Sequence, residues 1–184
     1  MHARLILTVI GPDAPGLVDA LAAVIARAGG SWRKSRMSRL SGQFAGIVEV
    51  DVPPSEIYAL NDGLSGLGER GLLVQTTPAA DGDVVEPPRV GHLAFVGQDR
   101  PGLVQAIAHV LARAGVNVDE LETHTFLAPM SGVQVFEADA AVHLPASLDL
   151  DALRTELEAV ARDLMVDVTF TPAPTDGRSG GRDG

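Results

Sequence analysis

Apolar residues follow two periodicities along this chain, and the same order of the two occurs twice. Short apolar runs with β-branched or aromatic members, typical of strands, occupy residues 4–10 and 91–96. Each run precedes a segment, 16–28 or 102–114, in which apolar residues recur three and four positions apart, and this spacing predicts a helix. A glycine directly follows each segment, where a left-handed helix C-cap favours that residue.

Each half continues with two strands, a second helix and a last strand. In the first half the second helix begins near Ser55 and contains several glycines, which weaken it. In the second half it covers about 149–164, with Ser147 or Asp149 as its N-cap. Tight turns between the middle strands fall at 41–43 and 129–132, and the last strands at 72–77 and 165–170.

The order of elements predicts an α+β fold. Strand, helix, strand, strand, helix and strand form the ferredoxin-like βαββαβ arrangement, an antiparallel sheet with both helices on one face. Residues 78–89 lie in a stretch that is rich in Pro, Gly, Asp and Ala without periodicity, and they predict a linker, while 172–184 has the composition of a disordered tail. We therefore expect two domains, at 1–77 and 90–171.

The two halves are copies of one unit. The stretch "GPDAPGLV" at 11–18 returns as "GQDRPGLV" at 97–104, and 13 of the 22 aligned positions of 11–32 and 97–118 are identical. Both halves share Gly-x-Asp-x-Pro-Gly-Leu at the same distance from the helix end. The period is too long for a solenoid repeat and fits a duplicated domain of about 80 residues.

The loop at 97–103 has the chemistry of an anion site. Gly97 is expected in a conformation that other residues avoid, Asp99 as the helix N-cap, and Pro101 in the first helical turn. Gly102 removes a side chain from that turn, so that a ligand can approach the backbone. A helix start with uncovered N–H groups suits a carboxylate or a phosphate. The alternative is a well-made strand-to-helix turn without a ligand.

Composition and charge exclude several functions. A chain without cysteine has no disulfide, thiolate nucleophile or cysteine-bound metal, and fits a cytoplasmic location. The net charge of −10 and the missing helix-turn-helix pattern oppose direct nucleic-acid binding. The first residues predict a strand rather than a signal peptide, and no apolar run is long enough to span a membrane. No nucleophile elbow or nucleotide motif is present, so we expect no enzyme activity and no cofactor.

The repeated loop within βαββαβ resembles the ACT domain, a small module that binds amino acids and regulates metabolic proteins. Two copies without an attached enzyme are similar to the glycine cleavage system transcriptional repressor family, and "ELETHT" at 120–125 adds to that likeness. The linker and the tail are too short for a catalytic domain. The resemblance implies an effector between paired domains, touching the first loop and the start of the second strand.

The resemblance also implies which residues bind the effector. The first copy departs from the second twice, with Ala14 in place of the arginine and Ser31 in place of the asparagine, so its part in binding is the weaker expectation. The expected ligand-binding residues are Gly97, Asp99, Arg100, Pro101, Gly102, Leu103 and Asn117 in the second copy, and Gly11, Asp13, Pro15, Gly16 and Leu17 in the first.

Three other groups of residues could have a function: a set of acidic and histidine residues, the single tryptophan and a basic cluster. Glu122 and His124 share a strand face and, with His143, could suggest a metal, but spacing fixes no third ligand and we expect none. Trp32 is expected in a core or an interface rather than in a binding site.

The basic cluster "RKSRMSR" is the third group. Strand alternation predicts Arg33 and Arg39 on one face, and Lys34 and Arg36 on the other. A split cluster on an edge strand indicates protection against aggregation rather than a nucleic-acid stripe.

Together with the resemblance, the pattern predicts a non-enzymatic, cytoplasmic regulator. The chain is expected to bind a small amino acid and to regulate a partner protein by contact, as a transcriptional regulator of amino-acid metabolism. The alternatives are a regulatory subunit acting in trans on an amino-acid metabolic enzyme, and a ligand-independent scaffold. Small sheets with open edges also predict that the repeats pack on each other and that the chain forms a homodimer. No membrane partner is expected.

Overall fold

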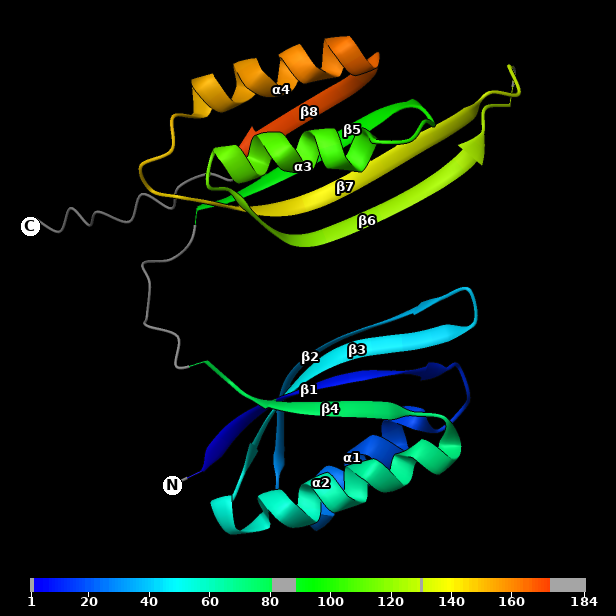
Figure 1. Ribbon diagram of the computed structural model, residues 1–184, viewed down its shortest axis with the longest axis vertical. Coiled ribbons are helices and arrows are strands. Elements are labelled where there is room, and N and C mark those ends of the chain that lie inside the picture. The colour runs from blue at the N-terminus through cyan, green and yellow to red at the C-terminus, as the bar shows by residue number, and fades with distance from the viewer. Residues whose placement is uncertain (1, 81–88, 130, 173–184) are drawn as a thin grey trace, which may run out of the picture. The chain divides into compact units, whose positions relative to one another are not determined.

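The computed structural model describes residues 2–80, 89–129 and 131–172, which form two separate compact units. Figure 1 shows that each unit is one sheet with two helices. Most of the predicted linker 78–89 and nearly all of the predicted tail 172–184 lie outside the described residues.

The first unit has the predicted βαββαβ order. Its second helix is interrupted, because glycines at 66 and 68 lie where the helical turns tighten into a 3-10 segment. The elements are β1 (Ala3–Pro12), α1 (Leu17–Arg27), β2 (Ser31–Leu40), β3 (Gln43–Val52), η1 (Pro54–Glu56), α2 (Ile57–Ser65), η2 (Gly66–Arg70) and β4 (Leu73–Pro78).

The second unit repeats this order with a longer second helix. Asp149 is the N-cap of that helix, as one of the two predicted candidates, because its carboxylate accepts hydrogen bonds from the N–H groups of Asp151 and Ala152 at 3.0 Å. The elements are β5 (Arg89–Gln98), α3 (Leu103–Arg113), β6 (Asn117–Leu127), β7 (Gln134–Leu144), α4 (Leu150–Leu164) and β8 (Val166–Pro172).

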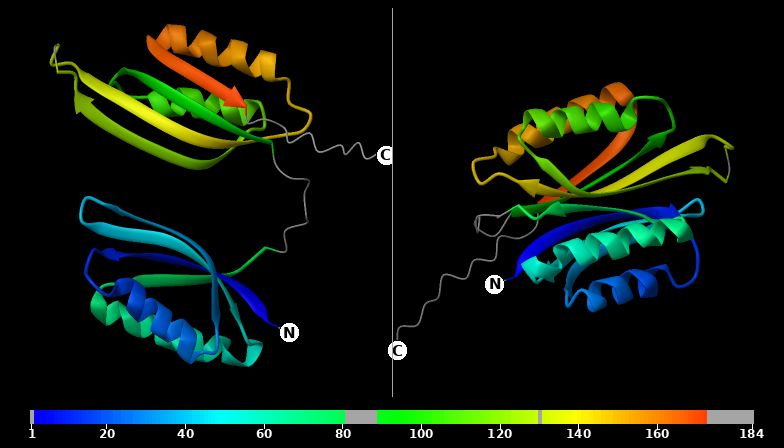
Figure 2. Two further views of the ribbon diagram at one scale, coloured as in Figure 1. Left: turned by 180° about the vertical axis from the view of Figure 1, so that it is seen from behind. Right: turned by 60° about the horizontal axis from the view of Figure 1, so that its bottom comes forward.

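Both sheets are antiparallel, with strand orders β2-β3-β1-β4 and β6-β7-β5-β8. Along β1, Leu5, Leu7 and Val9 are buried and alternate with more exposed residues, which is the pattern of a sheet with one covered face. Figure 2 shows both helices of each unit on the same face of its sheet. The α+β, ferredoxin-like prediction is therefore confirmed for both halves.

Glycines end the first helix of each unit as predicted. Gly29 and Gly115 have φ of +62° and +69°, a left-handed conformation that costs a residue with a Cβ more than glycine. Trp32 is half-buried against the first core, so its predicted packing role is confirmed.

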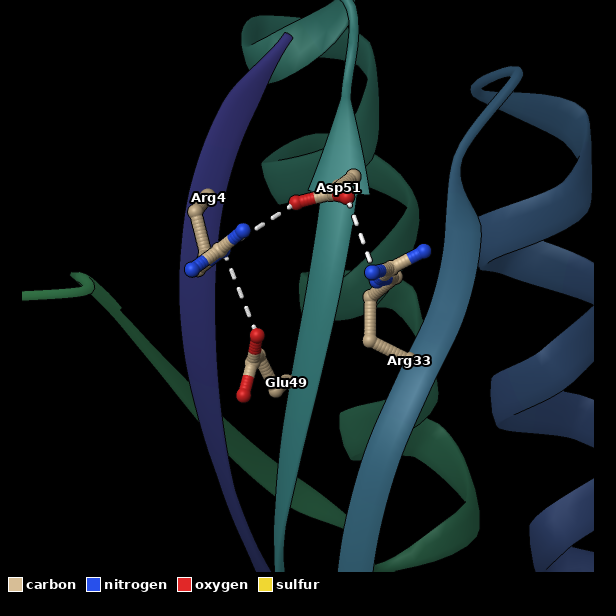
Figure 3. A network of polar contacts seen from close by, with 4 residues as sticks. All are labelled: Arg4, Arg33, Glu49 and Asp51. Atoms are coloured by element: carbon tan, nitrogen blue, oxygen red, sulfur yellow. Dashed lines mark hydrogen bonds and ion pairs between the residues drawn. The ribbon is translucent and has the colours of Figure 1, made fainter. Parts of the chain in front are cut away.

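The predicted division of the basic cluster between the two faces of β2 is wrong for Arg33. β2 bulges between Trp32 and Lys34, so the alternation of faces is interrupted at Arg33. Asp51 lies between two arginines (Figure 3). Its Oδ2 lies 3.3 Å from the Arg33 guanidinium, and its Oδ1 lies 3.4 Å from the Arg4 guanidinium. Arg33 therefore joins Lys34 and Arg36, which are paired with Glu49 and Ile47, on the face away from the helices.

The edge position of β2 is confirmed by the sheet order, and β6 occupies the same edge of the second sheet. All eleven residues of β6 are exposed, as are most of β2.

Candidate functional site

The loop between β5 and α3 is held against the rest of its domain by its first residues. A Cβ on Gly97 would lie 2.3 Å from Cγ1 of Val166, so only glycine lets β5 approach β8 there. Gly97 does not have the unusual backbone conformation that we predicted, since its φ is not positive. Gly11 occupies the same place in the first domain, where a Cβ would lie 2.5 Å from the Gly71 carbonyl oxygen.

The aspartates anchor the loops by their backbones. The N–H of Asp99 donates to the carbonyl of Gln134 at 2.8 Å, and that of Asp13 donates to the carbonyl of Gly42 at 2.8 Å. The predicted capping role of Asp99 is wrong, because α3 has Gly102 as its N-cap and no side chain bonds to its first turn. Pro101 therefore lies one residue before the cap and outside the first turn.

The N-cap glycines leave the helix starts open. Gly16 and Gly102 have φ of +86° and +95°, and a Cβ at either position would meet no described atom within 4 Å. The first backbone bond into α3 runs from the N–H of Ala106 to the carbonyl of Gly102, at 3.0 Å. Among the described residues, nothing accepts from the N–H groups of Leu103 and the two residues after it. These groups form the positive end of the helix dipole.

Charge distinguishes the two helix starts. The first turn of α1 contains Asp19, whereas the first turn of α3 contains no acidic residue and has Gln105 at the aligned position. An acidic side chain in a first turn satisfies the helix dipole and repels a bound anion. A carboxylate ligand is therefore better accommodated at α3 than at α1.

The aspartate side chains also differ. Asp13 accepts from Nη1 of Arg39 at 3.2 Å, so an arginine of β2 neutralises the first loop. The carboxylate of Asp99 has no hydrogen bond or ion pair with any described residue, because Thr125 stands where Arg39 stands in the first domain. The second loop thus has a carboxylate without a described partner three residues before the N-cap, and uncovered N–H groups after that cap.

Arg100 points away from the start of α3. Its Nη2 donates to the Asp163 carbonyl in the last turn of α4 at 3.5 Å, where the negative end of that helix attracts a cation. Its Nε is buried and has no partner among the described residues. Arg100 therefore joins the loop to α4, a contact that Ala14 cannot make in the first domain.

Asn117 does not lie beside the loop of its own domain. It opens β6, and the eleven residues of α3 separate it from the loop, which corresponds to about 16 Å of helix. Its Nδ2 donates to Asp119 at 3.0 Å. A ligand that touches both the loop and this asparagine needs a second domain. Ser31 has the same place in the first domain.

The remaining candidates form pairs rather than clusters. Glu122 and His124 share the face away from the helices, as predicted, and His124 lies 3.0 Å from Glu137. His92 lies 3.3 Å from Asp139. Within the described ranges, no three metal-ligating side chains come together. No described helix is long and apolar enough to span a bilayer.

Sequence reasoning missed two residues that distinguish the loops, Asp19 and Arg39. Asp19 could have been found, because the repeat alignment places it opposite Gln105. Arg39 could not, because its contact with Asp13 depends on how β2 is aligned with β3.

Comparison with known proteins agrees with this description. The family model for the ACT domain matches twice, at residues 3–76 and 93–171. A crystal structure described as "an Unknown Protein from Galdieria sulphuraria" has a TM-score of 0.81 at 29% identity, covering 95% of this chain and 100% of its own. One described as a "putative glycine cleavage system transcriptional repressor" has a TM-score of 0.73 at 19% identity, covering 95% and 99%.

No curated protein matches the chain. The two family matches cover most of its length, and each spans nearly all of one βαββαβ unit. The chain therefore belongs to the ACT-domain family and contains two ACT domains in tandem.

Proposed function

We propose that this chain is a non-enzymatic regulatory protein that binds a small amino acid mainly through the loop at the start of α3. The observation that carries the proposal is the difference between the helix starts. At α3 the N–H groups are uncovered, the first turn has no acid and Asp99 is unpaired among the described residues. At α1 the first turn contains Asp19, and the carboxylate of Asp13 is paired with Arg39.

A free amino acid has the charges that this loop complements. Its carboxylate would accept from the N–H groups of Leu103 and its neighbours, which point along the positive end of the helix dipole. Its ammonium group would lie against the carboxylate of Asp99, a charge-assisted contact. Gly102 leaves room for the backbone of the ligand, since no described atom lies within 4 Å of its Cβ position.

Asn117 would contribute from another domain. An amide supplies both donors and an acceptor, so it can bond to either end of an amino acid. Because it lies at the far end of α3 from its own loop, the site is proposed between paired domains. The other expected binding residues, including Gly97, Arg100 and Pro101, would shape the loop rather than touch the ligand.

A thermal-shift screen of the common amino acids tests the proposal. A ligand that binds only the folded state raises the apparent stability, by about 2.7 kcal/mol at a concentration 100-fold above Kd. We expect one or a few small amino acids to raise the unfolding temperature, and their decarboxylated amines to have no effect. If no amino acid shifts unfolding at 10 mM, the proposed function is wrong.

The regulated partner is proposed to be a protein. The charge of −10 opposes direct DNA binding, so a transcriptional role would work through contact with another regulator. An electrophoretic shift assay at low salt, where electrostatic binding is strongest, should show no complex. Co-purification distinguishes the alternatives, since a transcription factor would favour transcriptional regulation and a metabolic enzyme would favour a subunit acting in trans.

A further inference from the structure

An apolar groove opens on the helix side of the second domain, between α3 and the strand β6. It has about 270 Å³ of empty space, is open to solvent, and is lined by apolar side chains throughout. Phe95 and Ile107 lie buried at its floor, while Val104, Val118 and Leu121 are between 37% and 45% exposed. Pockets for drug-sized ligands have roughly 300–1,000 Å³, so this smaller groove suits a single side chain.

The first domain fills the same place with its own side chains. The bulges of β2 and β6 align Trp32 with Val118 and, five residues later, Met37 with Thr123. Trp32 and Met37 are half-buried and pack against the first core, whereas Val118 and Thr123 are exposed. Two large side chains of β2 thus correspond to two short ones of β6, which leave the groove open.

The groove is continuous with the proposed carboxylate site. The N–H of Val104 is one of the uncovered groups at the start of α3, and the side chain of the same residue lines the groove. Helical side chains lean toward the helix N-terminus, so this side chain covers the first turn on the side of β6. On the opposite flank of the helix start, Leu103 is buried against Ala161 and Val166. The open flank is therefore the one that leads into the groove.

We propose that the effector is a small amino acid with an apolar side chain, such as valine or leucine, and that this side chain occupies the groove. The inference rests on the proposed function, since the N–H groups of Leu103 and its neighbours hold the carboxylate of the ligand. Burial of each methylene group raises the affinity about fourfold. An aliphatic amino acid therefore binds more tightly than glycine, which has nothing to place in the groove.

Calorimetric titration of the full chain with glycine, alanine, valine and leucine tests the proposal without a variant. The affinity should rise with the size of the aliphatic side chain, so that valine or leucine binds at least tenfold more tightly than glycine. If no amino acid binds, both the proposed function and this inference are wrong. If glycine binds as tightly as valine and leucine, the groove assignment alone is overturned.

Ala108→Leu closes the groove from the helix side. Ala108 lines the groove and is exposed on α3, and leucine is nearly as good a helix former as alanine. The variant should weaken binding of valine and leucine at least tenfold, and the free protein should unfold at the same temperature as the parent or higher. Ala112→Leu is the matched control, because Ala112 is exposed one turn later on the same helix and lies outside the groove lining. It should change the affinity less than twofold.

Thr123→Met with Ala138→Gly closes the groove from the sheet side. In the first domain Met37 is paired with Gly46, where an added Cβ would lie 2.6 Å from Cγ of Met37, and in the second Thr123 is paired with Ala138. The double variant recreates the first pair and should weaken binding of valine and leucine as the helix variant does. Circular dichroism checks that each variant is folded. The proposal is overturned if either folded variant binds valine and leucine as the parent does, or if the control is the more damaging change.

Discussion

The loops that precede α1 and α3 have nearly the same backbone and different charges. Both use a glycine N-cap with positive φ and an aspartate N–H that bonds to the neighbouring hairpin. In the first domain Arg39 neutralises Asp13, and Asp19 occupies the first turn of the helix. In the second domain both of these features are missing from the described residues. Two copies of one sequence unit can thus share the backbone of this loop and differ in its charges, and the proposed amino-acid site rests on the charges of the second copy.

The largest expected effect comes from the glycines that hold the loops in place. Gly11→Ala should destabilise its domain by about 3 kcal/mol, since the added Cβ meets the Gly71 carbonyl oxygen of the backbone. Gly97→Ala should cost a similar amount, about 3 kcal/mol, because the added Cβ meets Cγ1 and Cβ of Val166, a β-branched residue whose Cβ is fixed by the backbone. Chemical unfolding followed by circular dichroism measures both losses. A loss of less than about 1 kcal/mol from either variant would contradict these close contacts.

Substitutions at the N-cap of α3 should come next. Helix propensity alone predicts no loss for Gly102→Val, since glycine is the poorer helix former, but a φ of +95° makes the substitution costly, because β-branched residues avoid this conformation. We expect a loss of about 2 kcal/mol or more for Gly102→Val and less than 1 kcal/mol for Gly102→Asn, since asparagine tolerates positive φ. Unfolding curves of both variants decide this, and a Gly102→Val protein as stable as the parent would contradict the assigned conformation.

The cap of α4 offers an independent check of the second domain. Asp149→Ala should cost about 0.5–2 kcal/mol, since two backbone N–H groups lose their acceptor. Ser147→Ala is the matched control and should change stability by less than 0.5 kcal/mol, because Ser147 has no capping bond. A larger loss from the serine variant would mean that the cap has been misassigned.

The smallest expected effect is the most specific to the comparison. Gln105→Asp gives α3 the acid that α1 has in Asp19. It should stabilise the helix by about 0.3–1 kcal/mol and weaken binding of an amino acid by about 2–5-fold, because the new carboxylate competes for the same dipole. Unfolding and titration on the same variant check both signs. Stability and affinity that rise together would contradict an anion site at this helix start.

Local patterns predicted the elements well, and contacts between distant residues account for the failures. The spacing of apolar residues placed both domains, and the glycines after α1 and α3 marked their ends. Asp99 was wrong as a cap because the left-handed Gly102 starts the helix three residues later. The face predicted for Arg33 was wrong because β2 has a bulge at that residue where it pairs with β3. The first error depends on a backbone conformation and the second on strand register, and apolar spacing specifies neither.

Calorimetric titration of two aspartate variants tests the central claim most directly. Asp99 does not cap α3, so Asp99→Ala removes a charge from the loop without removing a helix cap. With the amino acid found by thermal shift, Asp99→Ala should weaken binding at least tenfold, whereas Asp13→Ala, in which Arg39 loses its partner, should change the affinity by less than twofold. If Asp13→Ala is the more damaging variant, or if both variants bind as the parent does, the assignment of the amino-acid site to the second loop is wrong.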